Sequence, residues 1–251
     1  MDKFFWYTRS MKKESVMKQS QAKKRDNAMT NKILMGLIAL VLGLLFLEIL
    51  IVHSKNEQQK NVSNQVQTAR IMANGDLLYH DGLYMSALQA DGSYDFTENF
   101  TYVKPWLKQA DLVLGDFEGT INPDYPLSGY PLFNAPQSVT AAIKDAGYDV
   151  MDLAHNHILD SGLEGAFTTA DAFKKVGIDP IGVYEKPVRD KAPLLIKNVN
   201  GIKVAILSYA YGYNGLESNL TDKEVADHLS NLDEKRMKSE IQRAEKEADI
   251  T

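Results

Sequence analysis

A 20-residue run from Ile33 to Val52, interrupted by one charge at Glu48, constrains the fold of this chain more than any other sequence feature. At about 1.5 Å per residue, a helix over this run spans roughly 30 Å, the thickness of a bilayer's hydrocarbon core. Fifteen of the residues are Leu, Ile, Val or Phe. Their combined contribution to insertion outweighs the cost of one carboxylate. We therefore expect a transmembrane anchor at 33–52.

Two other interpretations of this run are a cleaved signal peptide and an apolar helix buried in a soluble core. The run is longer than the roughly 7–15 apolar residues of a signal peptide. The sequence that follows it, VHSKNEQQ, contains no small-x-small cleavage site. Both observations favour an uncleaved anchor.

The charge distribution on the two sides of the run predicts its orientation. Residues 1–32 carry nine Lys and Arg against three acidic residues, a net +6, which leaves −11 for the remainder of a chain whose net charge is −5. Because basic segments stay in the cytoplasm, we expect a single-pass protein of the cell membrane with an extracellular domain. The lipid bilayer is then a partner. A basic N-terminal segment followed by an acidic domain does not indicate nucleic-acid binding.

The polar segment 53–68 is typical of a juxtamembrane linker, so the sequence predicts a folded domain at 69–251. The chain contains no Cys. This excludes disulfides, thiolate zinc sites, iron–sulfur clusters and cysteine nucleophiles. Any metal must be bound by His, carboxylate or amide groups.

Short apolar runs alternate with helical patterns along the first half of this domain. The runs are 70–74, 111–115 and 148–154, and the expected helices are 100–110, 138–146 and 161–177. The last helix begins with a capping-box pattern, Ser161-x-x-Glu164. Alternation of this kind predicts an α/β fold with parallel strands.

Further along, Asn200-Gly201 between two apolar runs predicts a β-hairpin, which would make the sheet mixed. The charged stretch 221–248 has helical periodicity with a break near 231–233, so we expect two helices there. The final residues, 248–251, resemble the start of another strand. On this basis we expect the chain to be incomplete.

Polar residues with metal-binding chemistry follow three of the expected strands. The first strand is followed by Asp76 and His80, the second by Asp116 and Glu118, and the third by His155, Asn156, His157 and Asp160. Each group alone has an ordinary alternative: a turn cap, a surface histidine or solvated carboxylates. Because ligands of an open α/β sheet gather beyond the carboxyl ends of its strands, the three groups together predict a site for Mn, Fe or Zn.

Four motifs resemble the CapA family of capsule and poly-gamma-glutamate synthesis proteins. They are GDLLYH (75–80), GDFEGTI (115–121), HNHILDSG (155–162) and SYAYGYNG (208–215). The family belongs to the calcineurin-like metallophosphoesterase superfamily. The resemblance implies a four-layer fold, with two packed mixed sheets flanked by helices. It also implies an N-terminal tether like that of Gram-positive members.

The resemblance further implies two divalent metal ions and a role for each matching residue. The metal ligands would be Asp76, His80, Asp116, Glu118 and Asn156. His157 would be the general acid or the phosphate-contacting group. His155 stands where relatives commonly have Asn, and Tyr211 and Asn214 would line the same cleft.

One departure from the family pattern concerns the histidines. The family continues with a strand ending in His and later a Gly-His-x-His-like motif, which supply further metal ligands. The histidines here are His53, His80, His155, His157 and His228. For a polypeptide ending at Thr251, we expect weak or no binuclear metal binding and an incomplete sheet.

Three functions remain open at this point. The first is an anchored, extracytoplasmic protein of capsule or poly-gamma-glutamate synthesis or export, with a metal-dependent phosphoesterase site. The second is a non-catalytic accessory subunit that partners other membrane-bound components of a capsule synthase. The third is a phosphoesterase unrelated to capsules.

Overall fold

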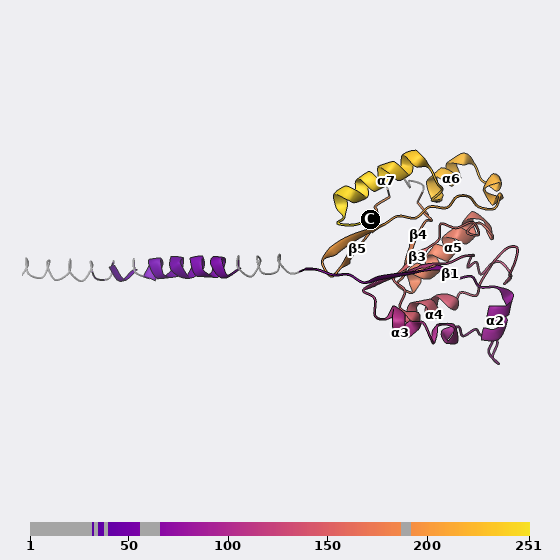
Figure 1. The fold of residues 1–251 in the computed structure, drawn as a ribbon, viewed down its shortest axis with the longest axis horizontal. Coiled ribbons are helices and arrows are strands. Elements are labelled where there is room, and N and C mark those ends of the chain that lie inside the picture. The colour runs from indigo at the N-terminus through magenta and orange to yellow at the C-terminus, as the bar shows by residue number, and fades with distance from the viewer. Residues whose placement is uncertain (1–31, 33–34, 38–39, 56–65, 187–191) are drawn as a thin grey trace, which may run out of the picture. The chain divides into compact units, whose positions relative to one another are not determined.

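The computed structural model describes residues 32, 35–37, 40–55, 66–186 and 192–251 of the chain. The chain divides into two compact units, 1–66 and 67–251. The first contains a helix, Met35–Lys55, whose mean hydropathy of 2.8 and length of 21 residues suffice for a membrane span (Figure 1). This helix extends beyond Val52 into the expected linker. Most of the expected basic segment and residues 56–65 of the linker lie outside the described residues.

The second unit contains a four-stranded parallel sheet in which the strands follow one another in chain order. Its strands are β1 (Ile71–Asp76), β2 (Leu112–Asp116), β3 (Val150–Asp152) and β4 (Asp179–Ile181). The helices of the unit are α2 (Asp81–Ala87), α3 (Lys104–Leu107), α4 (Val139–Ala146), α5 (Gly162–Lys175), α6 (Asp222–His228) and α7 (Glu234–Glu247). Its described residues also include the 3₁₀ turns η1 (Thr97–Phe100) and η3 (Leu216–Asn219). The expected α/β class with parallel strands is confirmed.

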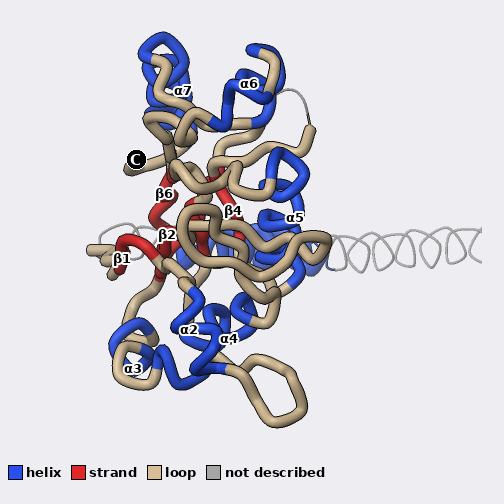
Figure 2. The backbone as a smooth tube through the Cα atoms, turned by 90° about the vertical axis from the view of Figure 1, so that its right-hand side faces the viewer, coloured by secondary structure: helices blue, strands red, loops and turns tan. Residues whose placement is uncertain are grey.

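Alternate residues of the sheet pack against different neighbours, as the period of a strand requires. Val113 and Met151 point into the larger hydrophobic cluster, with α4 and α5. Leu112 and Val150 point the other way, into a second cluster that they share with Val204. Figure 2 shows α2, α3 and α4 on one side of the strands and α6 and α7 on the other.

The second cluster joins the sheet to a hairpin of β5 (Leu195–Val199) and β6 (Ile202–Ile206). Its turn is Asn200-Gly201, and both residues have positive φ, 53° and 89°, as the sequence predicts for a tight hairpin. The hairpin forms its own two-stranded sheet, so the expectation that it joins the parallel strands in one mixed sheet is wrong. It covers a face of the parallel sheet instead, while α7 packs against β6.

Several expected elements are present close to their predicted bounds. Helix α4 ends at Gly147, whose φ of 114° terminates it. The stretch 221–248 forms α6 and α7, and α6 begins with a capping box between Thr221 and Glu224. At the end of the chain, Ile250 pairs in parallel with Val204 of β6, as expected for the start of a strand.

Two local predictions are wrong. The expected helix 100–110 is only the short α3, preceded by the turn η1, because Pro105 must occupy its first turn. Ser161 occupies the N-cap position of α5 without a side-chain cap. Its hydroxyl instead donates to Thr120 Oγ1 at 2.8 Å, so tertiary packing overrides the local pattern.

Candidate functional site

Three aspartates form a row at the carboxyl edge of the parallel sheet. Asp76, Asp116 and Asp152 end β1, β2 and β3, and the strand register pairs Asp76 with Asp116 and Asp116 with Asp152. Parallel strands bring their carboxyl ends to one edge, so this row is a direct consequence of the topology. The position also agrees with the edge at which open α/β sheets bind ligands.

Asp116 lies in the middle of the row and has the most perturbed carboxyl group there. Burial raises its pKa to about 7, helped by the negative charges of Asp152, Asp76 and Glu118. Its Oδ1 is buried without a hydrogen-bond partner among the described residues. A buried carboxylate with several like charges and an unpartnered oxygen is suited to binding a cation.

Asp152 was not identified as a site residue from the sequence. Its Oδ1 accepts hydrogen bonds from the Ser208 hydroxyl and, at 2.8 Å, from Ala154 N. Burial nevertheless raises its pKa. A signal was present in the sequence, because Asp152 interrupts the apolar run 148–154 directly after Val150 and Met151. Ser208 links this row to the segment that follows the hairpin.

Glu118 extends the acidic group beyond the end of β2. Burial and the neighbouring Asp76 carboxyl raise its pKa, while His157 opposes the rise. Glu118 Oε1 lies 3.7 Å from His157 Nε2. The acidic group and the imidazole are therefore neighbours in one site, as the sequence predicted.

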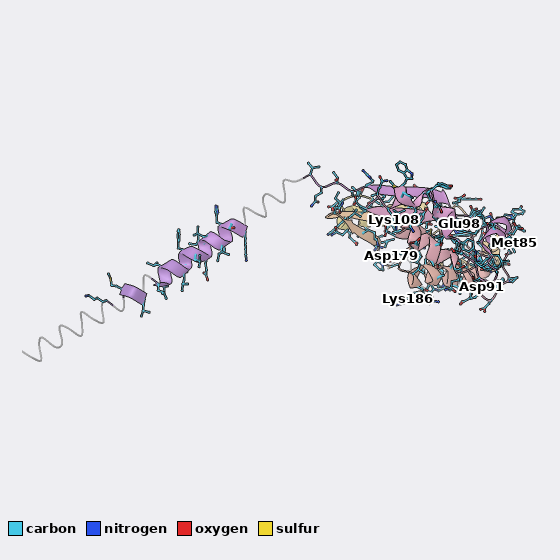
Figure 3. The ribbon with its side chains drawn as sticks, turned by 90° about the horizontal axis from the view of Figure 1, so that it is seen from below. Met85, Asp91, Glu98, Lys108, Asp179 and Lys186 are labelled. Carbon is cyan, nitrogen blue, oxygen red and sulfur yellow. The ribbon has the colours of Figure 1, made fainter. Side chains whose placement is uncertain are left out.

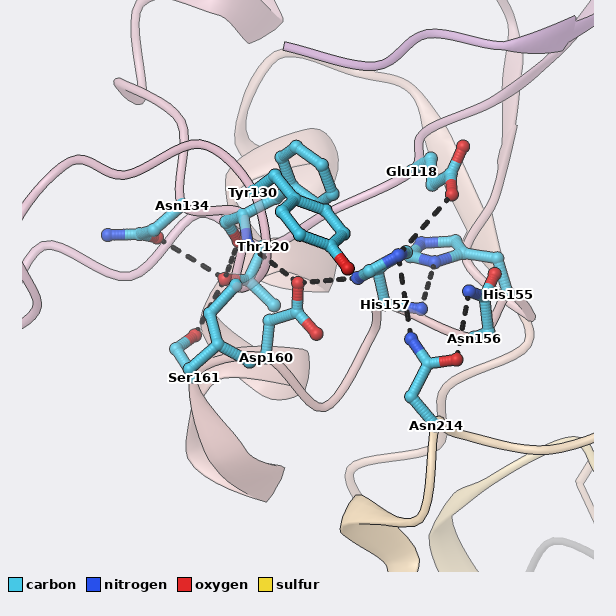
Figure 4. A network of polar contacts seen from close by, with 12 residues as sticks. Glu118, Thr120, Tyr130, Asn134, His155, Asn156, His157, Asp160, Ser161 and Asn214 are labelled. Atoms are coloured by element: carbon cyan, nitrogen blue, oxygen red, sulfur yellow. Dashed lines mark hydrogen bonds and ion pairs between the residues drawn. The ribbon is translucent and has the colours of Figure 1, made fainter. Parts of the chain in front are cut away.

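The imidazole of His157 is held in place by Asp160 (Figure 4). His157 Nδ1 lies 2.8 Å from Asp160 Oδ2, and the Asp160 side chain is only 1% exposed. The same oxygen accepts a hydrogen bond from Phe133 N at 2.6 Å. The Phe133 ring packs edge-on against the His157 ring with centroids 4.8 Å apart. These contacts fix the ring so that Nε2 points toward Glu118.

Two amides connect this histidine to the segment after the hairpin. Asn156 Nδ2 donates to Asn214 Oδ1 at 3.2 Å, and Asn214 Nδ2 lies 3.5 Å from His157 Nε2. Asn156 and Asn214, both predicted from the sequence, thus lie beside His157. Asn214 has a φ of 56°, a left-handed conformation that Asn tolerates.

His155 is buried beneath this group, with 7% exposure. Its Nδ1 accepts a hydrogen bond from His157 N at 3.1 Å. Burial lowers its pKa to about 3, so the ring is neutral at physiological pH. This placement gives His155 a supporting position under the His157 turn.

The remaining predicted residues, His80 and Tyr211, make other contacts or face solvent. His80 pairs with Asp81, and its Nε2 lies 3.3 Å from Tyr130 N. It approaches His157 only through Phe133, whose ring centroid is 5.7 Å away. Tyr211 is 79% exposed. The structure therefore does not bring His80 to the position expected for a ligand of the same metal as Asp76.

Comparison with known proteins identifies the family. The sequence profile of the family described as "Bacterial capsule synthesis protein PGA_cap" matches residues 70–251, nearly all of the second unit. This chain belongs to that family. The match begins at β1, so the capsule synthesis domain coincides with the α/β fold described above.

Three relatives show how the capsule synthesis domain compares with longer proteins. The chain is 34% identical over 115 residues to "Capsule biosynthesis protein CapA" of Bacillus anthracis, covering 44% of this chain and 28% of that protein. It is 26% identical over 204 residues to "PGA biosynthesis protein CapA" of Bacillus subtilis, covering 79% and 52%. It is 27% identical over 159 residues to "Uncharacterized protein y4sH" of Sinorhizobium fredii, covering 60% and 32%. The chain thus spans about half or less of the length of these relatives.

The chemistry of this site suits a divalent cation only in part. Burial and the charges of Asp152, Asp76 and Glu118 raise the pKa of Asp116, and burial and Asp76 raise the pKa of Glu118, which indicates a crowded carboxyl group suited to a counter-cation. Carboxylate oxygens are good ligands for hard divalent cations. Within the described ranges, however, no three His, Asp or Glu side chains surround one point closely enough to hold a metal.

Proposed function

We propose that this protein is a membrane-anchored, extracytoplasmic CapA-like protein of capsule or poly-gamma-glutamate synthesis or export, with a metallophosphoesterase-type site. The observation that carries the proposal is the row of Asp76, Asp116 and Asp152 beside an imidazole held by Asp160. An acidic edge suited to cations, next to an oriented histidine, is the combination that phosphoester hydrolysis needs.

The residues of the site would have different roles. Asp76, Asp116, Glu118 and Asn156 would hold divalent cations, two in a complete site, of Mn, Fe or Zn. Such ions neutralise phosphate charge and lower the pKa of an attacking water. His157, oriented by Asp160, would give a proton from Nε2 to the leaving oxygen. The proposed place of His80 among the ligands requires it to leave Tyr130 N and Asp81.

The four-layer architecture is part of the proposal. It is supported by the order of packing in the described residues: helices α4 and α5, the parallel sheet, the β5–β6 hairpin, then α7. The parallel pairing of Ile250 with Val204 extends the second sheet beside β6.

The proposed location is the cell membrane of a Gram-positive bacterium, with a single span and the domain outside. The apolar helix Met35–Lys55 and the +6 charge of residues 1–32 support this orientation. The relatives from two Bacillus species carry names that refer to capsule and PGA biosynthesis. Other membrane-bound components of capsule synthesis are the proposed partners.

A second candidate function is that of a non-catalytic accessory subunit of a capsule synthase. It is favoured by one specific observation: within the part of the chain that the structure covers, the acidic group does not form a three-ligand metal site. A subunit of this kind would keep the fold and its membrane partners without hydrolysing a phosphoester.

Hydrolysis of bis(p-nitrophenyl) phosphate by the full chain in nanodiscs with Mn²⁺ distinguishes the two candidates. The phosphoesterase proposal predicts turnover that His157→Ala lowers by about 10²-fold or more, the typical contribution of general acid–base catalysis. His228→Gln is the matched control, because His228 lies outside the site, bonded to Tyr184 O at 2.7 Å. Absence of turnover in folded protein with bound Mn²⁺ would favour the accessory subunit.

A further inference from the structure

A loop from Asn122 to Asn134 returns to the site at Phe133. Phe133 N donates to Asp160, and the Phe133 ring contacts the His157 ring. The ring centroid of Tyr130, an exposed residue of the same loop, lies 6.5 Å from that of Phe133. Figure 4 shows Tyr130 beside the His157–Asp160 pair. The loop therefore borders the position where a leaving group would be protonated.

The loop is held in a single shape by the side chain of Asn134. Its Nδ2 lies 3.0–3.1 Å from the carbonyl oxygens of Asn122, Tyr125 and Pro126, and its Oδ1 accepts from Asn122 N at 2.8 Å. Ser128 and Asn134 also exchange two backbone hydrogen bonds of 3.0 and 3.1 Å. A loop closed by this many bonds has already lost its conformational entropy before any ligand binds.

This rigid loop nevertheless presents apolar side chains to solvent. The exposed fractions are 52% for Tyr125, 37% for Leu127, 76% for Tyr130 and 45% for Leu132. Single exposed apolar residues are ordinary on a protein surface, but four on one preorganised loop beside a polar site indicate a contact surface. Tyrosine rings offer apolar area together with a hydroxyl at low entropic cost.

The charges around the site restrict what can contact this surface. Between residues 71 and 173 the basic residues are Lys104, Lys108 and Lys144. Lys144 Nζ bonds to Gly177 O at 2.9 Å, just before β4, at the amino edge of the sheet and opposite the site. Lys104 pairs with Asp145 at the end of α4. Figure 3 shows Met85 of α2 at one end of the folded unit, with Lys108 well away from it.

Residues 204–220, the end of β6 and the segment that follows it, contain no Lys or Arg. A polyanionic chain would therefore meet carboxylates at this site and find no basic side chain in the segments that form it. Bound cations could neutralise one phosphate group. They could not neutralise the many further negative charges of a polyanionic chain.

We infer that the loop 122–134 is a preformed wall that contacts the leaving group of a phosphoester, and that this leaving group is uncharged and carries a ring or an apolar chain. The inference rests on the proposed phosphoesterase function and specifies its substrate class. Tyr130 is the residue that determines this preference. It is the most exposed of the four large apolar side chains of the loop, and its ring contacts Phe133, which contacts His157.

Binding of non-hydrolysable probes to the full chain in nanodiscs with Mn²⁺, measured by calorimetry, tests this inference. The probes are inorganic phosphate, phenylphosphonate, octylphosphonate and a tetraglutamate peptide. We expect phenylphosphonate or octylphosphonate to bind about three- to tenfold more tightly than phosphate. Preference for the phenyl probe identifies a ring as the recognised group, and preference for the octyl probe identifies a chain.

Variants assign the preference to the loop. Tyr130→Ala should remove it while leaving phosphate affinity unchanged, and Tyr130→Phe should keep it. Tyr102→Ala is the matched control, since Tyr102 is 88% exposed and lies outside the loop. Three results would overturn this inference but leave the proposed function standing. They are equal affinities for phosphate and both phosphonates, full preference in Tyr130→Ala, and tighter binding of tetraglutamate than of the phosphonates. Absence of phosphate binding to wild-type protein with bound Mn²⁺ would overturn the proposed function as well.

Discussion

Asp116 is the residue on which the electrostatics of this site depend most. Its carboxyl lies at the end of β2, between the ends of β1 and β3, which also carry aspartates. No Lys or Arg follows any of these three strands before the next helix begins. The negative charge at this edge therefore destabilises the folded protein unless a proton or a cation neutralises it.

Replacing Asp116 by Asn should stabilise the metal-free protein at pH 8. The folded pKa of about 7 lies above the unfolded value, so the stabilisation from the protonated carboxyl is complete below about pH 4 and is lost as the pH rises through 7. We expect Asp116→Asn to raise the free energy of unfolding in urea by about 1–2 kcal/mol at pH 8, after discounting for solvent screening, and by little at pH 4.

The exposed Asp124→Asn is the matched control for this experiment and should change the stability at neither pH. A variant at Asp116 that is less stable than wild type at pH 8 in the presence of EDTA would contradict this account of the carboxylate row.

Residue types at strand ends made part of this site predictable. Four of the site residues come soon after apolar runs: Asp76, Asp116, Glu118 and His157. Because the strands are parallel and lie in chain order, these residues are expected close together at one edge of the sheet. The Asp152–Ser208 contact was not predictable, because it joins the end of β3 to a residue 56 positions away, in the segment after the hairpin.

At the scale of elements, the loop 122–134 is the feature that the sequence described least. It has neither helical nor alternating periodicity, and its shape depends on one buried side chain, Asn134. The hairpin at Asn200-Gly201 and the C-terminal helices were predictable because their turn and capping residues act locally. The helix expected at 100–110 and the cap at Ser161 failed where proline and a tertiary hydrogen bond decided the outcome.

Asn134→Ala should destabilise the second unit by about 2–4 kcal/mol, because it leaves Asn122 N and several carbonyl groups without their buried partner. Urea unfolding followed by circular dichroism measures this change. The exposed Asn219→Ala provides the comparison and should cost less than about 0.5 kcal/mol. A similarly small effect at Asn134 would show that the loop does not depend on this side chain.

For the whole molecule, the proposed arrangement is an acidic domain held outside the cell by a basic, membrane-inserted N-terminus. The nine Lys and Arg of residues 1–32, immediately before the apolar run, favour this orientation. The same acidic domain would repel a polyanionic polymer, within a Debye length of about 8 Å at physiological salt. Both effects agree with a site that acts on a phosphoester in capsule synthesis rather than on the finished polymer.

The absence of Cys from the sequence makes this orientation directly measurable. Single-cysteine variants Ser218→Cys, on an exposed turn, and Ser20→Cys, in the basic segment, can be treated with a membrane-impermeant maleimide on intact cells. In intact cells we expect labelling at position 218 and none at position 20. After permeabilisation we expect labelling at position 20 as well. The reverse pattern would place the domain in the cytoplasm and exclude the proposed location.

The central claim is that the strand-end carboxylates of this capsule synthesis domain form a divalent cation site. Calorimetric titration of Mn²⁺ into the full chain in nanodiscs at pH 8 tests it most directly. The account predicts saturable binding that Asp116→Asn weakens by at least about tenfold, the effect expected for losing a ligand or its support, and that Asp124→Asn leaves unchanged. Absence of Mn²⁺ binding to the folded protein, or equal binding by Asp116→Asn, would contradict it.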